Sequence, residues 1–235
     1  MTRPLCIDLF CGLGGWTEGF LAEGYDCIGF DIECHVYGAH RYPAQLVLQD
    51  VRTLDGAQFK DAAIIVASSP CQEFSYRAMP WKRAKALGPP ELGMELFAQA
   101  ARIQREACAA AGRYIPMVQE NVCGAQRWVG RASWHYGSFY LWGDVPALMP
   151  MTMQASKNSG GSWFNIAHNT GSGRGNNPDG RKVRGGWFAD GQWQRRGSEG
   201  SRARKAASAR IAKIPLALAR HIAHVYRPER HAEVA

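Results

Sequence analysis

The stretch Asp8-Leu9-Phe10-Cys11-Gly12-Leu13-Gly14-Gly15 links an apolar run to a segment of helical character. We expect a strand over Leu5–Phe10 and a helix over Trp16–Glu23 that ends at Gly24. Glycines in such a turn let a nucleotide-bearing ligand approach the backbone and the helix N-terminus. A dinucleotide fingerprint would require glycine where Thr17 stands, so an adenosine without a pyrophosphate fits this turn better.

Short apolar runs alternate with helical stretches beyond this turn, which is typical of βαβ units and a parallel sheet with both faces covered. The longest helical stretch, Glu91–Ala111, has apolar residues at helical spacing and is followed by Gly112. The remaining strands are expected at Cys27–Phe30, Leu46–Leu48, Ala62–Ala67, Ile115–Gln119 and Ser138–Trp142. The sequence therefore predicts an α/β fold with a Rossmann-like sheet.

The composition changes after residue 150. Residues 151–205 are rich in Gly, Ser, Asn, Arg and Trp and poor in aliphatic residues, so we expect an insertion without an ordinary core. An apolar-periodic helix is expected over Ala206–Tyr226, with Pro215 near its start and one face packed on the main domain. The predicted divisions are a main domain (1–150), the insertion (151–205), a C-terminal helix (206–227) and a tail (228–235).

The net charge favours a polyanionic partner. The 235 residues carry a formal charge of +8, and Lys and Arg side chains that neutralise phosphates release condensed counterions. No apolar run approaches the roughly 20 residues that span a bilayer, and Asp8 interrupts the short apolar stretch near the start, so we expect a cytoplasmic protein. The seven cysteines include no C-x-x-C pair, which predicts neither a disulfide framework nor a metal site.

Cys71 is the candidate nucleophile. It lies in Ser68-Ser69-Pro70-Cys71-Gln72-Glu73-Phe74-Ser75, directly after the most apolar predicted strand. Open α/β sheets bind ligands at the carboxyl ends of their strands, and a helical turn or a cation there would raise the thiolate fraction. A buried structural cysteine is the alternative interpretation.

Acidic residues follow three other predicted strands. Glu120, in Gln119-Glu120-Asn121-Val122, could protonate a ring nitrogen if its surroundings raise the pKa of its carboxyl group. Asp31 is placed to bind ribose hydroxyls, and Asp50 to accept a hydrogen bond from an adenine amino group. For Asp31 and Asp50 the alternative is a solvated carboxylate at the end of a strand.

Five blocks together resemble the conserved blocks of the cytosine-5 DNA methyltransferase family: DLFCGLGG (8–15), FDIE (30–33), QDV (49–51), PCQEFS (70–75) and QENV (119–122). The resemblance covers about residues 5–125. Ala212-Lys213-Ile214-Pro215 is similar to the last block of the family, and SFYLWG (138–143) to the strand after its Q-x-R-x-R motif. The resemblance implies a class I methyltransferase sheet, and residues 151–205 would be a reduced target-recognition region.

The resemblance also implies a chemistry. Cys71 would add to carbon 6 of a flipped cytosine while Glu120 contacts the ring nitrogen and the exocyclic amine, so that carbon 5 becomes nucleophilic toward the methyl group of S-adenosylmethionine. Asn121 is expected to orient the loop that carries the thiol, with Gln72 and Ser75 shaping that loop against DNA. The donor is expected to bind at Phe10, Gly12, Gly14, Gly15, Asp31, Ile32, Asp50, Pro70 and Lys213.

Three features depart from the family pattern. Ile32 stands where many relatives have an aromatic residue over the adenine, and Lys213 replaces a polar residue near the methionine end of the donor. One hypothesis is that Lys213 accommodates a carboxylated donor analogue and that carboxymethyl is transferred; alternatively it binds the methionine carboxylate or a phosphate, or points to solvent. The Q-x-R-x-R motif has no clean equivalent, and Arg127 and Arg131 are the nearest candidates, with exposed surface arginines as the alternative.

The insertion would contact DNA through basic side chains that bind phosphates. The candidates are Arg181, Arg184, Arg195 and Arg196. We expect a monomer that acts on double-stranded DNA in the cytoplasm of a bacterial or phage-infected cell. The competing hypotheses are a tRNA cytosine-5 methyltransferase, since that branch shares the same blocks, a catalytically silent DNA-binding relative, and an NAD-dependent oxidoreductase, which Thr17 disfavours.

Overall fold

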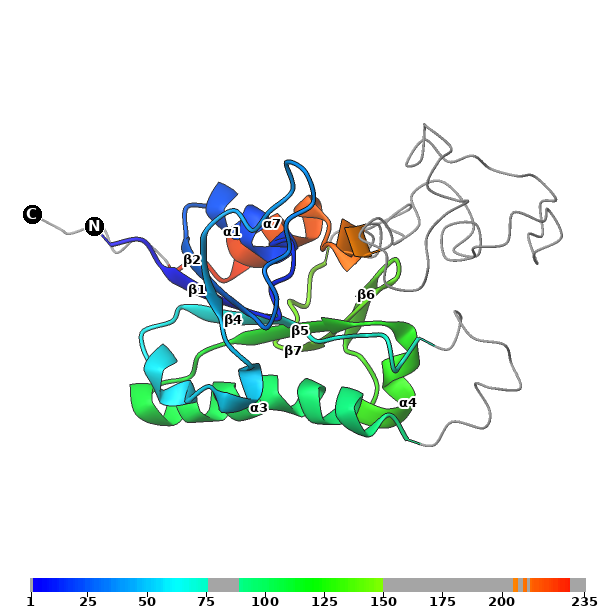
Figure 1. Ribbon diagram of the computed structural model, residues 1–235. Coiled ribbons are helices and arrows are strands. Elements are labelled where there is room, and N and C mark those ends of the chain that lie inside the picture. Colours follow the sequence, from blue (N-terminus) through cyan, green and yellow to red (C-terminus); the bar gives the residue numbers. More distant parts are fainter. Residues whose placement is uncertain (1, 76–88, 150–204, 207–208, 211, 229–235) are drawn as a thin grey trace, which may run out of the picture.

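A seven-stranded mixed sheet forms the centre of the protein, with α1 (Gly15–Ala22) and α7 (Leu216–Val225) on one face and α3 (Glu91–Ala111) and α4 (Gln126–Val129) on the other (Figure 1). The computed structural model describes residues 2–75, 89–149, 205–206, 209–210 and 212–228. The insertion predicted at residues 151–205 lies outside this part except for its last residue.

The strand order is β3-β2-β1-β4-β5-β7-β6. The first five strands pair in parallel, whereas β7 runs antiparallel to both β5 and β6. The strands are β1 (Leu5–Leu9), β2 (Asp26–Asp31), β3 (Gln45–Leu48), β4 (Ile64–Ser68), β5 (Met117–Asn121), β6 (Trp134–Tyr136) and β7 (Phe139–Gly143). Three short 3-10 helices complete the described elements: η1 (Val51–Thr53), η2 (Gly56–Phe59) and η4 (Cys123–Ala125). This sheet, covered by helices on both faces, confirms the predicted Rossmann-like α/β fold.

Two expectations about the elements were incomplete or wrong. Strand β6 was not predicted, because a run of three residues is too short to show a period of apolar and polar residues. A continuous helix over Ala206–Tyr226 is also wrong, since α7 begins only at Leu216. Pro215 precedes it in an extended conformation, with φ −62° and ψ 135°, because proline is tolerated at the start of a helix but not in its interior.

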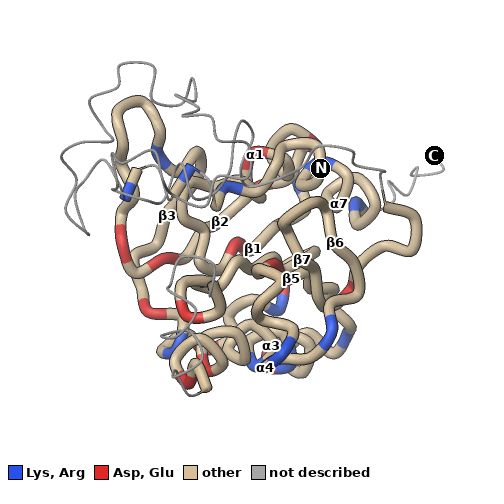
Figure 2. The backbone as a smooth tube through the Cα atoms, turned by 90° about the vertical axis from the view of Figure 1, so that its right-hand side faces the viewer, with Lys and Arg blue, Asp and Glu red and all other residues tan. Residues whose placement is uncertain are grey.

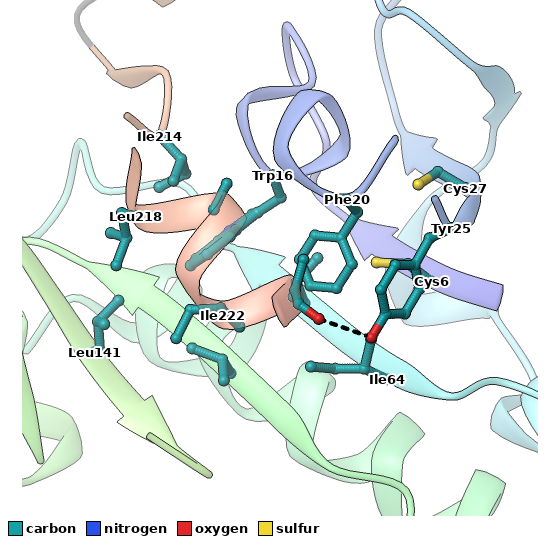
Figure 3. Packing of buried hydrophobic residues seen from close by; sticks show 14 of the residues in the cluster. Cys6, Trp16, Phe20, Tyr25, Cys27, Ile64, Leu141, Ile214, Leu218 and Ile222 are labelled. Atoms are coloured by element: carbon teal, nitrogen blue, oxygen red, sulfur yellow. Dashed lines mark hydrogen bonds between the residues drawn. The ribbon is translucent and has the colours of Figure 1, made fainter. Parts of the chain in front are cut away.

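The core is divided between the two faces of the sheet. Under α1 and α7, Trp16, Phe20 and Ile222 pack against β1 and β4 (Figure 3). On the same side the hydroxyl of Tyr25 donates a hydrogen bond to the Ala223 carbonyl oxygen at 3.0 Å. On the opposite face, side chains of α3 pack over the strands together with those of η1 and η2; they include Ile7, Leu9, Val51, Leu54, Phe59, Ile65, Ala100, Ile103 and Ala107. The two layers hold the strand ends in fixed positions.

Helix α1 approaches α7 closely because two of its positions are glycine. A Cβ atom at Gly15 would overlap the backbone nitrogen of Ile214, and one at Gly19 would overlap the Cβ of Ala219 and lie 2.6 Å from its carbonyl carbon. Trp16 is buried in the same contact between the two helices.

We predict that Gly19→Ala destabilises the protein by about 1–3 kcal/mol, the usual cost of overpacking. Alanine is the better helix former by about 1 kcal/mol, so a gain in stability would be expected if α1 stood alone. Urea unfolding followed by circular dichroism measures the change. The double variant Gly19→Ala/Ala219→Gly should recover part of the loss, because it removes one of the overlapping Cβ atoms. A midpoint for Gly19→Ala at or above the wild-type value would contradict the close contact.

Candidate active site

The carboxyl ends of the parallel strands β1, β2, β4 and β5 meet at one edge of the sheet, where open α/β sheets bind their ligands. Figure 2 views the molecule from this end and shows acidic positions beside the labels of β1 and β5. Two segments converge there: the glycine-rich turn after β1, and the segment after β4 that carries Cys71.

The glycine-rich turn after β1 is tightly wound. Phe10 has φ 56°, a left-handed value that is uncommon for a residue with a side chain and is often found at functional sites. Gly12 and Gly14 also have positive φ, and the Gly14 N–H donates to the Cys11 carbonyl oxygen at 2.7 Å. The backbone thus turns sharply into the N-terminus of α1, whose first N–H groups point toward this edge.

Asp31, at the end of β2, closes the turn from the neighbouring strand. One carboxylate oxygen accepts the Gly12 N–H at 2.8 Å, and the other accepts the Glu33 N–H at 3.1 Å and lies 3.5 Å from Nε2 of His35. Burial by itself would raise the pKa of Asp31, but the hydrogen bonds from His35, Glu33 and Gly12 together lower it. Asp31 is therefore an ionised acceptor at the mouth of the turn.

Asp8 lies on the same face of the sheet as Asp31 but deeper. Its Oδ2 accepts the Thr17 hydroxyl at 2.7 Å, while Oδ1 is buried and has no hydrogen-bond partner among the described residues. Burial raises the pKa of Asp8 to about 8; the hydrogen bonds from Thr17 oppose this shift and the charge of Asp31 adds to it. The two acids therefore differ in charge at neutral pH: Asp31 is an anion and Asp8 is protonated.

The segment after β4 carries the candidate nucleophile. Cys71 is half-buried, and the Phe74 N–H donates to its carbonyl oxygen at 3.1 Å, which makes a turn directly after the strand. Phe74 is fully buried against Trp142 and Ala125. Glu73 accepts the Gly93 N–H at 2.6 Å and so ties the turn to the first residues of α3.

The end of β5 supplies the partner of this segment. Glu120 is 3% exposed and lies opposite Ser68 in the parallel register of β5 with β4. Asn121 is fully buried, and its Nδ2 donates to the carbonyl oxygen of Ser69 at 3.1 Å and to its hydroxyl at 3.0 Å. The indole N–H of Trp16 donates to the Ser68 hydroxyl at 3.0 Å, so α1 also holds the end of β4.

The ends of β4 and β5 lie beside the glycine-rich turn. This edge of the sheet therefore carries a thiol, a buried acid and a turn of the kind expected to bind an adenosine-bearing ligand. Residues 5–115 match the family model of C-5 cytosine-specific DNA methylases. Over this region the chain is similar to the cytosine-5 methyltransferase family. The match covers the turn, Asp31, Asp50 and the segment of Cys71, and ends before Glu120.

Two curated bacterial relatives are similar over part of the chain. The type II methyltransferase M.XorII of Xanthomonas oryzae is 32% identical over 87 residues, which are 32% of this chain and 20% of that protein. The type II methyltransferase M.DdeI of Desulfomicrobium norvegicum is 35% identical over 78 residues, covering 29% of this chain and 19% of that protein. The matched part thus spans about a fifth of the length of these methyltransferases.

Among solved structures, a prophage-encoded E. coli protein described as a DNA modification methyltransferase aligns with a TM-score of 0.41 and 19% sequence identity, over 67% of this chain and 55% of that one.

The structure places three residues that the sequence predicted to bind the donor: Ile32 and Lys213, which depart from the family pattern, and Asp50, which matches it. Ile32 is 71% exposed at the tip of β2. Asp50 caps η1 and pairs with Arg52, whose hydrogen bonds lower the pKa of Asp50. Nζ of Lys213 lies 2.5 Å from Oε1 of Glu18 on α1. The Lys213 cation thus has a carboxylate partner within the protein.

The remaining predicted site residues lie around these segments. Pro70 and Gln72 are exposed beside Cys71, and Ser75 is half-buried. Arg131 is exposed ahead of β6, and the guanidinium of Arg127 lies 4.9 Å from the ring centre of Trp128. The basic residues Arg181, Arg184, Arg195 and Arg196 lie outside the described residues.

Sequence reasoning missed several residues that support these segments: Trp16, Thr17, His35, Tyr42 and Ser69. Trp16, Thr17, Tyr42 and Ser69 have partners 25 or 52 residues away, which a local pattern cannot identify. His35 lies only four residues after its partner Asp31, so its spacing was a signal that could have found it. Within the described ranges, no cluster of three or more His, Cys, Asp or Glu residues could hold a metal ion. None of the helices in those ranges combines the length and apolarity needed to cross a membrane.

We predict that Asp8 makes the stability of the protein fall as the pH rises from about 4 to about 8. The folded protein keeps this proton up to about pH 8, whereas the unfolded chain releases it near its ordinary value of 3.8. The stabilisation that Asp8 contributes is therefore fully present below about pH 4. As the pH rises above this value, the free energy of unfolding falls by up to ~1.4 kcal/mol per pH unit. Urea unfolding at a series of pH values should show this slope reduced in Asp8→Asn. Parallel curves for the two proteins would contradict the raised pKa.

Proposed function

We propose that this protein is a DNA cytosine-5 methyltransferase in which Cys71 is the nucleophile and Glu120 the acid that contacts the target base. The observation that carries the proposal is the bridge from Asn121 to Ser69, which joins the two strand ends bearing these groups. A thiol and a buried carboxyl group held on adjacent strands suit addition to an aromatic ring with protonation of that ring.

The proposed reaction begins with a cytosine flipped out of the stack, since its ring cannot be attacked within the duplex. The Cys71 thiolate forms a bond to carbon 6 of the ring. Glu120 hydrogen-bonds the ring nitrogen and exocyclic amine and stabilises the protonated adduct, so carbon 5 becomes electron-rich. After carbon 5 has taken up the transferred group it loses its proton, the bond from carbon 6 to sulfur breaks, and the thiolate is restored.

The residues around the turn fit S-adenosylmethionine, which supplies a sulfonium-bound methyl group. The ionised Asp31 carboxylate suits two ribose hydroxyls, and Gly12 and Gly14 leave room for a ligand at the backbone. Phe10, next to them in the turn, would contact the adenine. The pairing of Lys213 with Glu18 supports ordinary S-adenosylmethionine over a carboxylated analogue, because the Lys213 charge is already compensated.

Double-stranded DNA is the proposed substrate, and the protein would act as a cytoplasmic monomer. The net charge of +8 supports a polyanionic partner, and both curated relatives are named type II methyltransferases. Arg127, Arg131 and the turn of Gln72 and Ser75 are proposed to line the DNA side of the site, with the arginines of the insertion binding phosphates. A tRNA substrate is the alternative that the same experiment tests.

We expect incubation of the wild-type protein with S-adenosylmethionine and duplex DNA to produce 5-methylcytosine, and Cys71→Ser to reduce this activity below detection. Nucleoside mass spectrometry distinguishes methyl from carboxymethyl when the carboxylated donor is supplied in competition. Transfer RNA is assayed in parallel.

DNA containing 5-fluorocytosine should trap wild-type protein covalently, because fluorine blocks loss of the group from carbon 5. Trapping of Cys71→Ala, or no modified cytosine in DNA, would contradict the proposal.

A second prediction concerns the bridge between the strand ends. Asn121→Ala should lower kcat by about 10–100-fold while the affinity for the donor stays within about 2-fold, because a misplaced thiol slows attack. Steady-state methylation and calorimetric donor binding measure the two effects. Gln119→Ala is the matched control: its buried amide donates to Phe97 of α3 at 3.0 Å, so its loss should cost similar stability but little kcat. Equal losses of kcat in both variants would contradict a positioning role for Asn121.

A further inference from the structure

A buried chain of three polar side chains lies beneath the glycine-rich turn. The Tyr42 hydroxyl lies 2.6 Å from the Thr17 hydroxyl, which lies 2.7 Å from Oδ2 of Asp8. In the bond between Tyr42 and Thr17 either hydroxyl could be the donor. Burial raises the pKa of Tyr42 far above its usual range, so its hydroxyl stays protonated.

The fold leaves space for Tyr42 at two glycines. A Cβ atom at Gly14 would lie 3.0 Å from the Tyr42 ring and would overlap the side chain of Pro43. A Cβ at Gly29 in β2 would lie 2.5 Å from the Tyr42 hydroxyl oxygen and 2.8 Å from the Cys11 sulfur. The ring therefore lies between the glycine-rich turn and β2, 7% exposed, and touches both.

We propose that Tyr42 is a positioning residue for the methyl donor: through Thr17 and Asp8, it holds the glycine-rich turn in the conformation that binds the donor. This inference rests on the proposed function, because it assigns the turn to the donor. The Tyr42 ring supports Gly14 from below, and its hydroxyl joins the loop before β3 to α1 and to β1. Tyr42 lies against Gly14, Gly29 and Thr17, at the turn assigned to the donor, so its effect should fall on donor binding rather than on attack at the base.

The protonation state of Asp8 should affect how well Tyr42 and Thr17 hold the glycine-rich turn. The titratable groups that face Asp8 are Asp31 at the end of β2, Cys6 in β1, Cys11 in the turn, and Tyr42. No cation is recorded among them in the described residues, so ionised Asp8 would be a buried, uncompensated charge directly below the turn. The affinity for the donor should therefore decrease as the pH rises through about 8, the value to which burial raises the pKa of Asp8.

The test compares two tyrosine-to-phenylalanine variants, each of which removes one buried hydroxyl. Tyr42→Phe keeps the ring that fills the space at Gly14 and loses only the bond to Thr17. Tyr25→Phe is the matched control, because its hydroxyl bonds the Ala223 carbonyl oxygen in α7 at 3.0 Å. Calorimetric binding of S-adenosylhomocysteine, the stable product of the donor, gives Kd at pH 6.5, 7.5 and 8.5, and steady-state assays give KM and kcat.

We expect Tyr42→Phe to raise the Kd about 3–10-fold, the effect of one lost hydrogen bond, with kcat at saturating donor unchanged. Tyr25→Phe should lower the unfolding midpoint but leave Kd within 2-fold. Asp8→Asn should make Kd less dependent on pH than in the wild type. Equal Kd values for wild type and Tyr42→Phe, or equal losses in both tyrosine variants, would overturn the inference. A wild-type protein that binds no S-adenosylhomocysteine would instead overturn the proposed function, and this inference with it.

Discussion

The parallel pairing of β4 with β5 is the constraint on which the candidate active site depends. It sets Ser68 opposite Glu120, and one residue further on Asn121 hydrogen-bonds Ser69, the second residue before Cys71. Because side chains alternate between the two faces, a shift of register by one residue would turn Glu120 toward α3 and remove the Asn121 bridge. The register is stabilised by the apolar layers on both faces, where Ile65, Val66 and Val118 are fully buried.

The charge of each of the two acids at the sheet edge depends on how deeply its carboxyl group is buried. Asp31 and Asp8 extend from the same face of neighbouring strands, yet hydrogen bonds lower the pKa of the first and burial raises that of the second. The ionised acid lies at the mouth, where a polar ligand can approach, and the neutral acid lies below the turn, where a charge would lack a partner. Thr17 and Tyr42 complete this arrangement by linking the neutral acid to the loop before β3.

Much of the fold could be predicted from the sequence, because its signals are local. The glycines after Leu9, the apolar run before Ser68 and the helical spacing of Glu91–Ala111 each specify an element through a few neighbouring residues. These local sequence signals fail to predict an element where tertiary packing overrides them. The three residues of β6 form a strand because β7 lies beside them, and Pro215 adopts an extended conformation before α7 despite an apolar pattern that continues through it.

The sequence by itself pointed to the candidate reactive groups: the cysteine after an apolar strand, the Glu120 block and the glycine-rich turn stand in the order of the blocks that the family shares. Only the tertiary structure decided what holds them. Thr17 and Tyr42 are 25 residues apart, and Lys213 and Glu18 are 195 apart. Such contacts follow from how α1, α7 and the loop before β3 pack on the sheet. A local pattern cannot encode them, because the free energy that brings these side chains together comes from burying the whole layer.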